Sequence, residues 1–87
     1  MNAFRVWVRP LEYEYVVRVD GLQNAQWLSH QLARSFVFHS AKPISQEDDS
    51  SLYTFQVPRD PFLSFSGIKK LLTAMPEVTL LGWAAAN

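Results

Sequence analysis

The chain has 87 residues, the size of one small domain, and its eight basic residues balance eight acidic ones. It contains no cysteine, which excludes disulfides, thiolate metal sites, iron–sulfur clusters and cysteine nucleophiles. The balanced charge is also atypical of general nucleic-acid binders, whose affinity comes from a basic surface.

Hydropathy and composition predict a cytoplasmic domain that does not enter a membrane. The N-terminus lacks the basic start and apolar run of a signal peptide, and no apolar stretch reaches the roughly 20 residues of a membrane span. Aromatic residues make up 14% of the chain, which brings large side chains to a small core. We expect residues 1–87 to form a single domain with its core in 12–83.

Two strands are predicted at the start of the chain. Residues 4–9 and 13–19 alternate between apolar and polar side chains, which is the period of a half-buried strand. Pro10 ends the first run, because proline cannot donate to a ladder. One face of the second run carries Tyr13, Tyr15, Val17 and Val19. We expect the segment 3–9 to be either an extension of the second strand or an arm that pairs with another chain.

Two helices are predicted from apolar spacing. The first covers 22–36, and either Asp20 or Asn24 can cap its start. Its buried stripe consists of Ala25, Leu28, Leu32 and Phe36. The second begins at Asp60 and Pro61, because aspartate caps a helix and proline fits its first position. Its buried stripe consists of Phe65, Ile68, Leu71, Leu72 and Met75.

Three more strands complete the pattern. Residues 42–46 and 52–57 are predicted to form a hairpin around the polar turn 47–51, and 78–81 to form the last strand. Without the first strand, the order is β-α-β-β-α-β. We therefore predict an α+β, ferredoxin-like split β-α-β sandwich. Its two helices would lie on one face of an antiparallel sheet, with an extra or extended N-terminal strand.

The sheet face opposite the helices is expected to be unusually apolar. Its candidate interaction residues are Trp7, Val16, Arg18, Leu52, Thr54, Gln56, Leu81 and Trp83. An open apolar face usually marks a partner surface, and closed two-fold pairs are the commonest assemblies. The sequence thus predicts a homodimer or another protein partner. RNA-binding domains of this architecture stack bases on this face, but the predicted phase directs Tyr15, Tyr53 and Phe55 inward, which disfavours nucleic acid.

No motif predicts a reaction, a cofactor or a metal. His30 and His39 lack a second ligand at metal-binding spacing, so we interpret both as surface residues. The acidic run Glu47, Asp48 and Asp49 lacks the alternating ligands and the glycine of a calcium loop, and is interpreted as a solvated turn.

A small anion could be held at the second helix. Ser64 and Ser66 lie in its first turns, where free backbone amides attract anions. The competing interpretation is a capped helix that contains two serines, because the cap itself occupies those amides.

The segment 17–25, together with residues 75–78, resembles ACT-type regulatory domains. Those domains have a glycine-containing turn after the first strand and often bind amino acids at a dimer interface. The resemblance implies a ligand site at Asp20, Gly21 and Asn24. The same turn is similar to that of heavy-metal-associated domains, whose two cysteines are missing here. Acylphosphatases share the size and fold, but their phosphate loop is not visible, and dimeric α+β barrel enzymes share the topology.

Two functional hypotheses follow. The first is a non-catalytic interaction or regulatory domain that self-associates. The alternative is a sensor of small molecules, or an enzyme of the α+β barrel kind, with a pocket between helix and sheet. RNA binding on the open sheet face is the third.

Overall fold

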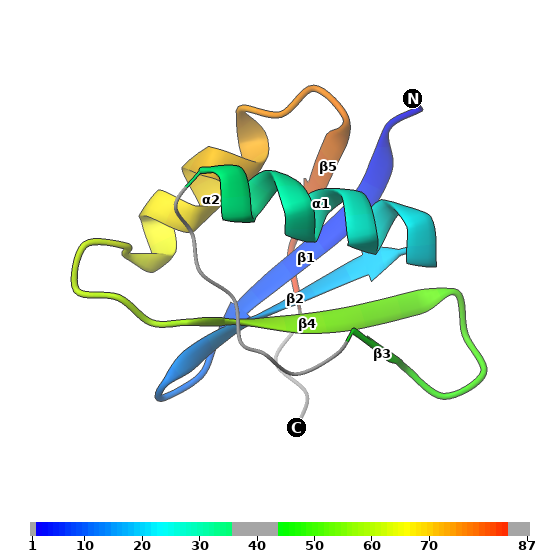
Figure 1. Ribbon diagram of the computed structural model, residues 1–87, viewed down its shortest axis with the longest axis horizontal. Coiled ribbons are helices and arrows are strands. Elements are labelled where there is room, and N and C mark those ends of the chain that lie inside the picture. The colour runs from blue at the N-terminus through cyan, green and yellow to red at the C-terminus, as the bar shows by residue number, and fades with distance from the viewer. Residues whose placement is uncertain (1, 36–43, 84–87) are drawn as a thin grey trace.

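The computed structural model describes residues 2–35 and 44–83 of the chain (Figure 1). Its elements, in order, are β1 (Phe4–Pro10), β2 (Glu14–Asp20), α1 (Leu22–Arg34), β3 (Ser45–Gln46), β4 (Leu52–Pro58), α2 (Phe65–Thr73) and β5 (Val78–Leu81). The described strands form one mixed sheet in the order β3-β4-β2-β1-β5, and both helices cover the same face of it (Figure 1). The predicted α+β class is confirmed.

The N-terminal strand β1 lies inside the sheet and is paired along both edges. It forms an antiparallel hairpin with β2, in which Val8 lies opposite Val17. On its other edge it runs parallel to β5, with Val6 opposite Leu80. The expectation of a purely antiparallel sheet is therefore wrong, and a ferredoxin-like arrangement is not confirmed, because β1 separates β2 from β5. Since both edges are used, β1 is neither an extension of β2 nor a free arm.

The pairing of β1 explains why proline is tolerated at its end. The Leu11 amide donates to the Glu14 carbonyl at 2.7 Å and closes the hairpin. Alternation along the ladder then directs the Arg9 amide toward β2 and the Pro10 nitrogen toward the other edge. There β5 ends at Leu81, opposite Trp7. The missing donor of proline therefore costs no ladder bond between the described strands.

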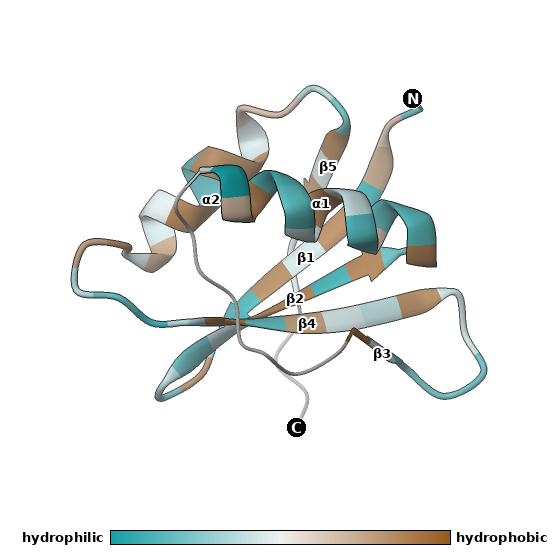
Figure 2. Cartoon of the chain, viewed as in Figure 1, coloured by the Kyte–Doolittle hydropathy of each residue, from teal (hydrophilic) through white to brown (hydrophobic). Residues whose placement is uncertain are grey.

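The core lies between the sheet and the two helices, as the alternation predicts. Figure 2 shows hydrophobic residues alternating with hydrophilic ones along β1 and β2. Tyr15 and Phe55 are buried and Tyr53 packs against the same cluster, so the predicted inward phase of these rings is confirmed. The Tyr15 hydroxyl donates to the Leu63 carbonyl at 2.8 Å. Tyr13 was expected on this face, but it precedes β2 in the hairpin turn and is 78% exposed.

The start of α1 differs from the prediction. Neither Asp20 nor Asn24 caps it, because the N-cap is Gly21, which makes no side-chain cap bond. Gly21 adopts a φ of 98°, in the region that favours glycine. The Asn24 amide group instead donates to the Asp20 backbone carbonyl at 2.8 Å. The expected stripe of α1 is confirmed as far as Leu32, and Phe36 lies outside the described residues.

The second helix begins later than predicted. Asp60 accepts a hydrogen bond from the Phe62 amide at 2.8 Å and closes a turn ahead of the helix. The N-cap is Ser64, whose hydroxyl accepts from the Gly67 amide at 2.9 Å. An aspartate–proline pair therefore marks a turn here, because the same side-chain chemistry serves turns and caps. Neither described helix combines the length and the apolar character needed to cross a bilayer.

The turn at Gly21 provides a stability test. A Cβ added there would lie 3.0 Å from Asn24 Nδ2 and would occupy a disfavoured φ. We expect Gly21→Ala to lower the free energy of unfolding by about 1–3 kcal/mol, measured by urea denaturation. The matched control is Gly82→Ala, whose Cβ would meet nothing within 4 Å, and which should stay within about 0.5 kcal/mol of the wild type. Equal effects of both substitutions would contradict this account of Gly21.

Candidate functional site

The strand register brings the predicted interaction residues together on the open face of the sheet. One row across the sheet joins Leu81, Trp7, Arg18 and Thr54 on four adjacent strands. A second row joins Arg9, Val16 and Gln56. Leu52 lies beside Asp20, opposite it in the β2–β4 pair. The predicted surface is thus a contiguous set of side chains.

Arginine and tryptophan side chains alternate on this face in what we call the Arg–Trp ladder. Its members, in spatial order, are Arg5, Trp7, Arg18, Trp83 and Arg9. The Arg18 guanidinium lies between two indoles, 4.5 Å from the Trp7 ring centroid and 4.2 Å from that of Trp83. The Arg9 guanidinium lies 4.6 Å from the Trp83 ring centroid, and that of Arg5 lies 5.3 Å from the Trp7 ring centroid. Each contact is of the cation–π kind.

The ladder covers its own aromatic surface. Trp7 is only 9% exposed, although it points away from the helices. Acidic groups accompany two of the arginines, since Arg5 pairs with Asp20 and Arg18 lies 3.6 Å from Glu47. The indole faces that could stack a base already contact guanidinium groups, and two of the three ladder charges are balanced. This arrangement weakens the case for nucleic-acid stacking on the open face.

Some polar atoms of the open face are buried without a partner. They are the Nε atoms of Arg9 and Arg18 and the Oε1 atom of Gln56. Burying such groups unpaired costs free energy, so the stacking contacts around them must offset a penalty. The ladder thus combines cation–π contacts with buried polar atoms that lack a partner, and planar guanidinium groups suit such stacking better than an ammonium group would.

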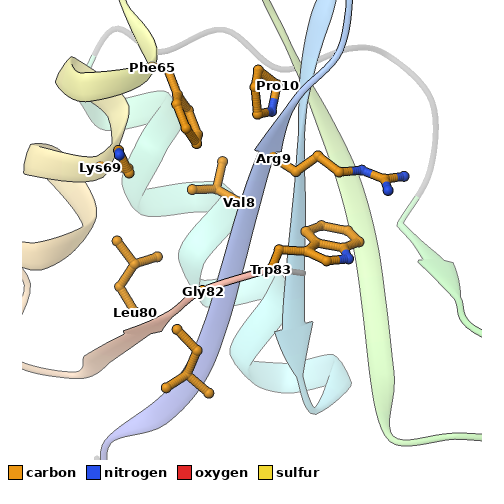
Figure 3. Close-up of a pocket in the computed structure, with 9 residues that line it drawn as sticks. Val8, Arg9, Pro10, Phe65, Lys69, Leu80, Gly82 and Trp83 are labelled. Atoms are coloured by element: carbon orange, nitrogen blue, oxygen red, sulfur yellow. The ribbon is translucent and has the colours of Figure 1, made fainter. Parts of the chain in front are cut away.

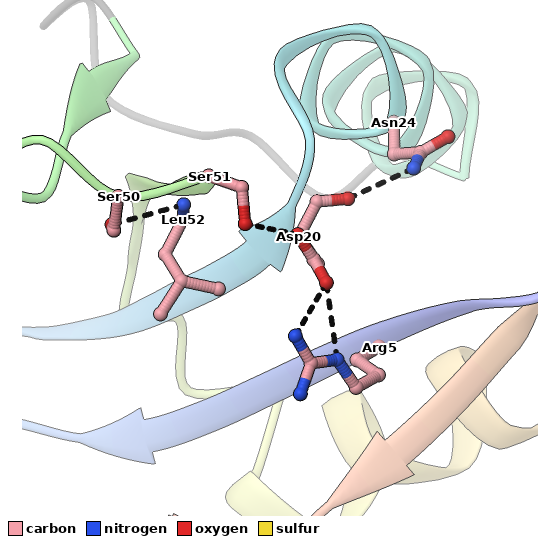
Figure 4. A network of polar contacts seen from close by, with 6 residues as sticks. All are labelled: Arg5, Asp20, Asn24, Ser50, Ser51 and Leu52. Carbon is pink, nitrogen blue, oxygen red and sulfur yellow. Dashed lines mark hydrogen bonds and ion pairs between the residues drawn. The ribbon is translucent and has the colours of Figure 1, made fainter.

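Asp20 and Asn24 belong to a polar network at the end of β2 (Figure 4), and the Gly21 amide donates to the Ser51 carbonyl at 2.7 Å. The Asp20 carboxylate accepts from Arg5 Nε at 3.1 Å and from Ser51 Oγ at 2.6 Å. The hydrogen bond from Ser51, followed by that from Arg5, lowers the pKa of the Asp20 carboxyl below its ordinary value. These contacts join β1, β2, the start of α1 and the turn directly before β4. The groups of the expected ligand turn are thus already bonded to one another.

The other sequence candidates are dispersed. Ser64 caps α2, and Ser66 is exposed in its first turn. His30 is exposed on α1, as expected, and His39 lies outside the described residues. Among the residues that the structure describes, no three histidine, cysteine or acidic side chains gather in a way that could hold a metal ion.

Sequence reasoning missed a group of exposed apolar residues in two neighbouring loops at one end of the sheet. It consists of Leu11, Tyr13 and Phe62, which are 38%, 78% and 97% exposed. We call these three residues the aromatic end. The loop that carries Phe62 is tied to the β1–β2 hairpin, because the Arg59 amide donates to the Tyr13 carbonyl at 3.0 Å. The available signal was turn propensity. Pro10 and Asp60 each mark a turn, and the aromatic residues that follow them, Tyr13 and Phe62, are therefore expected in loops.

Comparisons with known proteins give no further indication. No protein-family model matches the chain, and neither a curated protein sequence nor a solved structure is significantly similar to it.

The Asp20 network predicts a specific pH dependence. Because the pKa of Asp20 is lower in the folded chain than its ordinary value of 3.8, its contribution to stability is present at neutral pH. That contribution is lost as the pH falls below 3.8 through the folded-state pKa. We expect Asp20→Asn to be less stable than the wild type at pH 7 by less than about 1 kcal/mol, since the pair is solvent-screened. The difference in the free energy of unfolding between Asp20→Asn and the wild type should become smaller in acid. Urea unfolding at several pH values measures it.

The control for this experiment is Asp49→Asn, which alters an exposed carboxylate in the neighbouring β3–β4 turn. This variant should follow the wild-type profile. A difference between Asp20→Asn and the wild type that stays constant from pH 7 to acid would contradict the assigned role of the carboxylate.

The Arg–Trp ladder predicts that stacking, not charge alone, stabilises the open face. Arg18→Lys keeps the charge but removes the planar group between the two indoles. We expect it to lower the free energy of unfolding by about 1–2 kcal/mol, the range for partly desolvated cation–π contacts. Arg34→Lys, at the exposed end of α1, should change stability little. Equal stability of the two variants would show that the ladder contributes nothing beyond charge.

Proposed function

We propose that the chain is a non-catalytic binding module that self-associates through the aromatic end. The observation that carries the proposal is the exposure of Tyr13 and Phe62, two large rings left in water at the same end of the sheet. Single exposed apolar residues are ordinary on protein surfaces, but several of them on two loops that are hydrogen-bonded to each other favour a partner surface. Aromatic residues are enriched among those that dominate binding free energy.

The two segments of the aromatic end are held in fixed relation to each other. The loop after β4 is bonded to the hairpin at three places. The Arg59 amide donates to the Tyr13 carbonyl, Arg59 Nη1 donates to the Glu12 carbonyl at 3.4 Å, and the Tyr15 hydroxyl donates to the Leu63 carbonyl. Phe62 lies between these attachment points. Figure 1 shows the β1–β2 turn and the loop between β4 and α2 at the same side of the molecule. Such preorganisation reduces the entropy lost when a partner binds.

Charge complementarity favours a second copy of the chain as the partner. Glu12, Arg59 and Asp60 are all exposed beside the aromatic end, so both signs are present in one patch. A two-fold interface places the same patch of both subunits face to face, and this requires a surface that complements itself. Arg59 of one copy would then meet Glu12 or Asp60 of the other. The small extent of the patch is typical of a weak, reversible dimer.

The open sheet face is the competing surface for self-association. Val16 and Leu81 remain accessible there, with Leu81 36% exposed. The Arg–Trp ladder, however, covers Trp7, the largest apolar group of that face. The aromatic end therefore offers more uncovered ring surface per residue than the open face.

Self-association can be measured by sedimentation velocity between about 10 and 500 μM. We expect a reversible dimer whose dissociation constant rises at least tenfold in the double variant Tyr13→Ser/Phe62→Ser, because hot-spot truncations typically cost about 2 kcal/mol or more. Leu22→Ser is the matched control, since Leu22 is also an exposed apolar residue but lies at the start of α1. It should leave the dissociation constant unchanged.

Charge reversal distinguishes a specific two-fold contact from non-specific hydrophobic association. Arg59→Glu should weaken the dimer, and the double variant Glu12→Arg/Arg59→Glu should restore it. A wild-type chain that stays monomeric at 500 μM would overturn the proposal. So would a dimer that Leu81→Ser dissociates while Tyr13→Ser/Phe62→Ser leaves it intact, because the open face would then be the interface.

A further inference from the structure

A cavity of about 370 Å³ lies between α2 and the ends of β1 and β5 (Figure 3). It exists because β1 continues to Pro10, whereas β5 ends at Leu81, opposite Trp7. On that edge the last residues of β1 therefore have no described strand beside them, although β2 still pairs with their other edge, and the space under α2 stays open. Val8, Phe65 and Leu80 belong to its apolar lining.

Lysine supplies the charge on the helix side of this cavity. Lys69 Nζ lies 4.4 Å from the centroid of the Phe65 ring. Neither ion pair in the described part of the chain includes Lys69. The described lining contains no acidic residue. An anionic group entering the cavity thus meets an ammonium group without competition from a carboxylate of the wall.

The second cation of the lining has a different role. Figure 3 shows Phe65, Lys69 and Leu80 on one side of β1, and Arg9 with Trp83 on the other. The Arg9 guanidinium points away from Lys69 and lies 4.6 Å from the Trp83 ring centroid, within the Arg–Trp ladder. The charge that faces the apolar wall therefore comes from Lys69 alone.

We propose that this cavity binds a small amphipathic carboxylate. Its aliphatic body packs against Val8, Phe65 and Leu80, and its carboxylate pairs with Lys69 Nζ. The volume lies within the roughly 300–1,000 Å³ of small-molecule sites, and an apolar wall with one placed charge is their usual composition. This site shares no residue with the aromatic end, so it does not depend on the proposed self-association.

The test titrates the full chain with octanoate and follows backbone amide shifts by NMR. We expect saturable shifts at Val8, Leu80 and Gly82, which line the cavity. Octylamine, which has an alkyl chain of similar length and the opposite charge, should bind at least tenfold more weakly than octanoate. Shortening the acid should weaken binding roughly fourfold per methylene group, the value of a buried CH₂.

Neighbouring lysines of α2 give a matched pair of variants. Lys69→Gln should weaken octanoate binding about tenfold and remove the preference over octylamine. Lys70→Gln, also exposed but outside the lining, should leave both affinities unchanged. Thermal unfolding of both variants verifies that each stays folded.

Three results would overturn the inference. They are the absence of saturable shifts at millimolar octanoate, equal affinities for octanoate and octylamine, and equal effects of the two lysine substitutions. Each concerns the cavity alone and leaves the dimer measurement unaffected.

Discussion

The arrangement on which the rest of the structure depends is the pairing of β1 with β2 on one edge and with β5 on the other. The first pair is local, because a short turn connects the strands. The second joins Phe4 to Val78 across almost the whole chain, so its loop-closure entropy must be offset by burial. That burial is supplied by the inward side chains of β1, of which Val6 is fully covered. The N-terminal residues thus hold the last strand in the sheet.

The Arg–Trp ladder and the cavity under α2 both follow from this placement of β1. Its outward side chains, Arg5, Trp7 and Arg9, lie between the outward side chains of β2 and the segment after β5, which lets guanidinium and indole groups alternate across strands. Its greater length relative to β5 leaves the gap that becomes the cavity under α2. A longer β5 would close that gap, and a β1 at the edge of the sheet would not bring Trp7 against Arg18.

Local periodicity predicted the strands, the helices and the inward phase of Tyr15, Tyr53 and Phe55, because each depends on spacing within one segment. The position of β1 could not be predicted in this way, since it depends on competition between distant strands for one edge. The hydrogen-bond partners of Asp20 could not be predicted from local pattern either, because Arg5 and Ser51 are 15 and 31 residues away in the sequence. Tyr13 was misplaced because alternation does not reveal where a hairpin turn ends and its strand begins.

Trp7 and Phe62 show why apolar content alone does not identify a partner surface. Trp7 stands on the sheet face without helices, where the sequence predicts exposure, yet neighbouring arginines reduce its exposure to 9%. Phe62 lies in a loop, where polar residues are usual, and is 97% exposed. Arginine stems and planar guanidinium groups can cover an indole because they are themselves largely apolar along their length. Among the described residues, Phe62 makes no aromatic or cation–π contact, so water still surrounds its ring. Uncovered ring surface is therefore concentrated at Phe62 and not at Trp7.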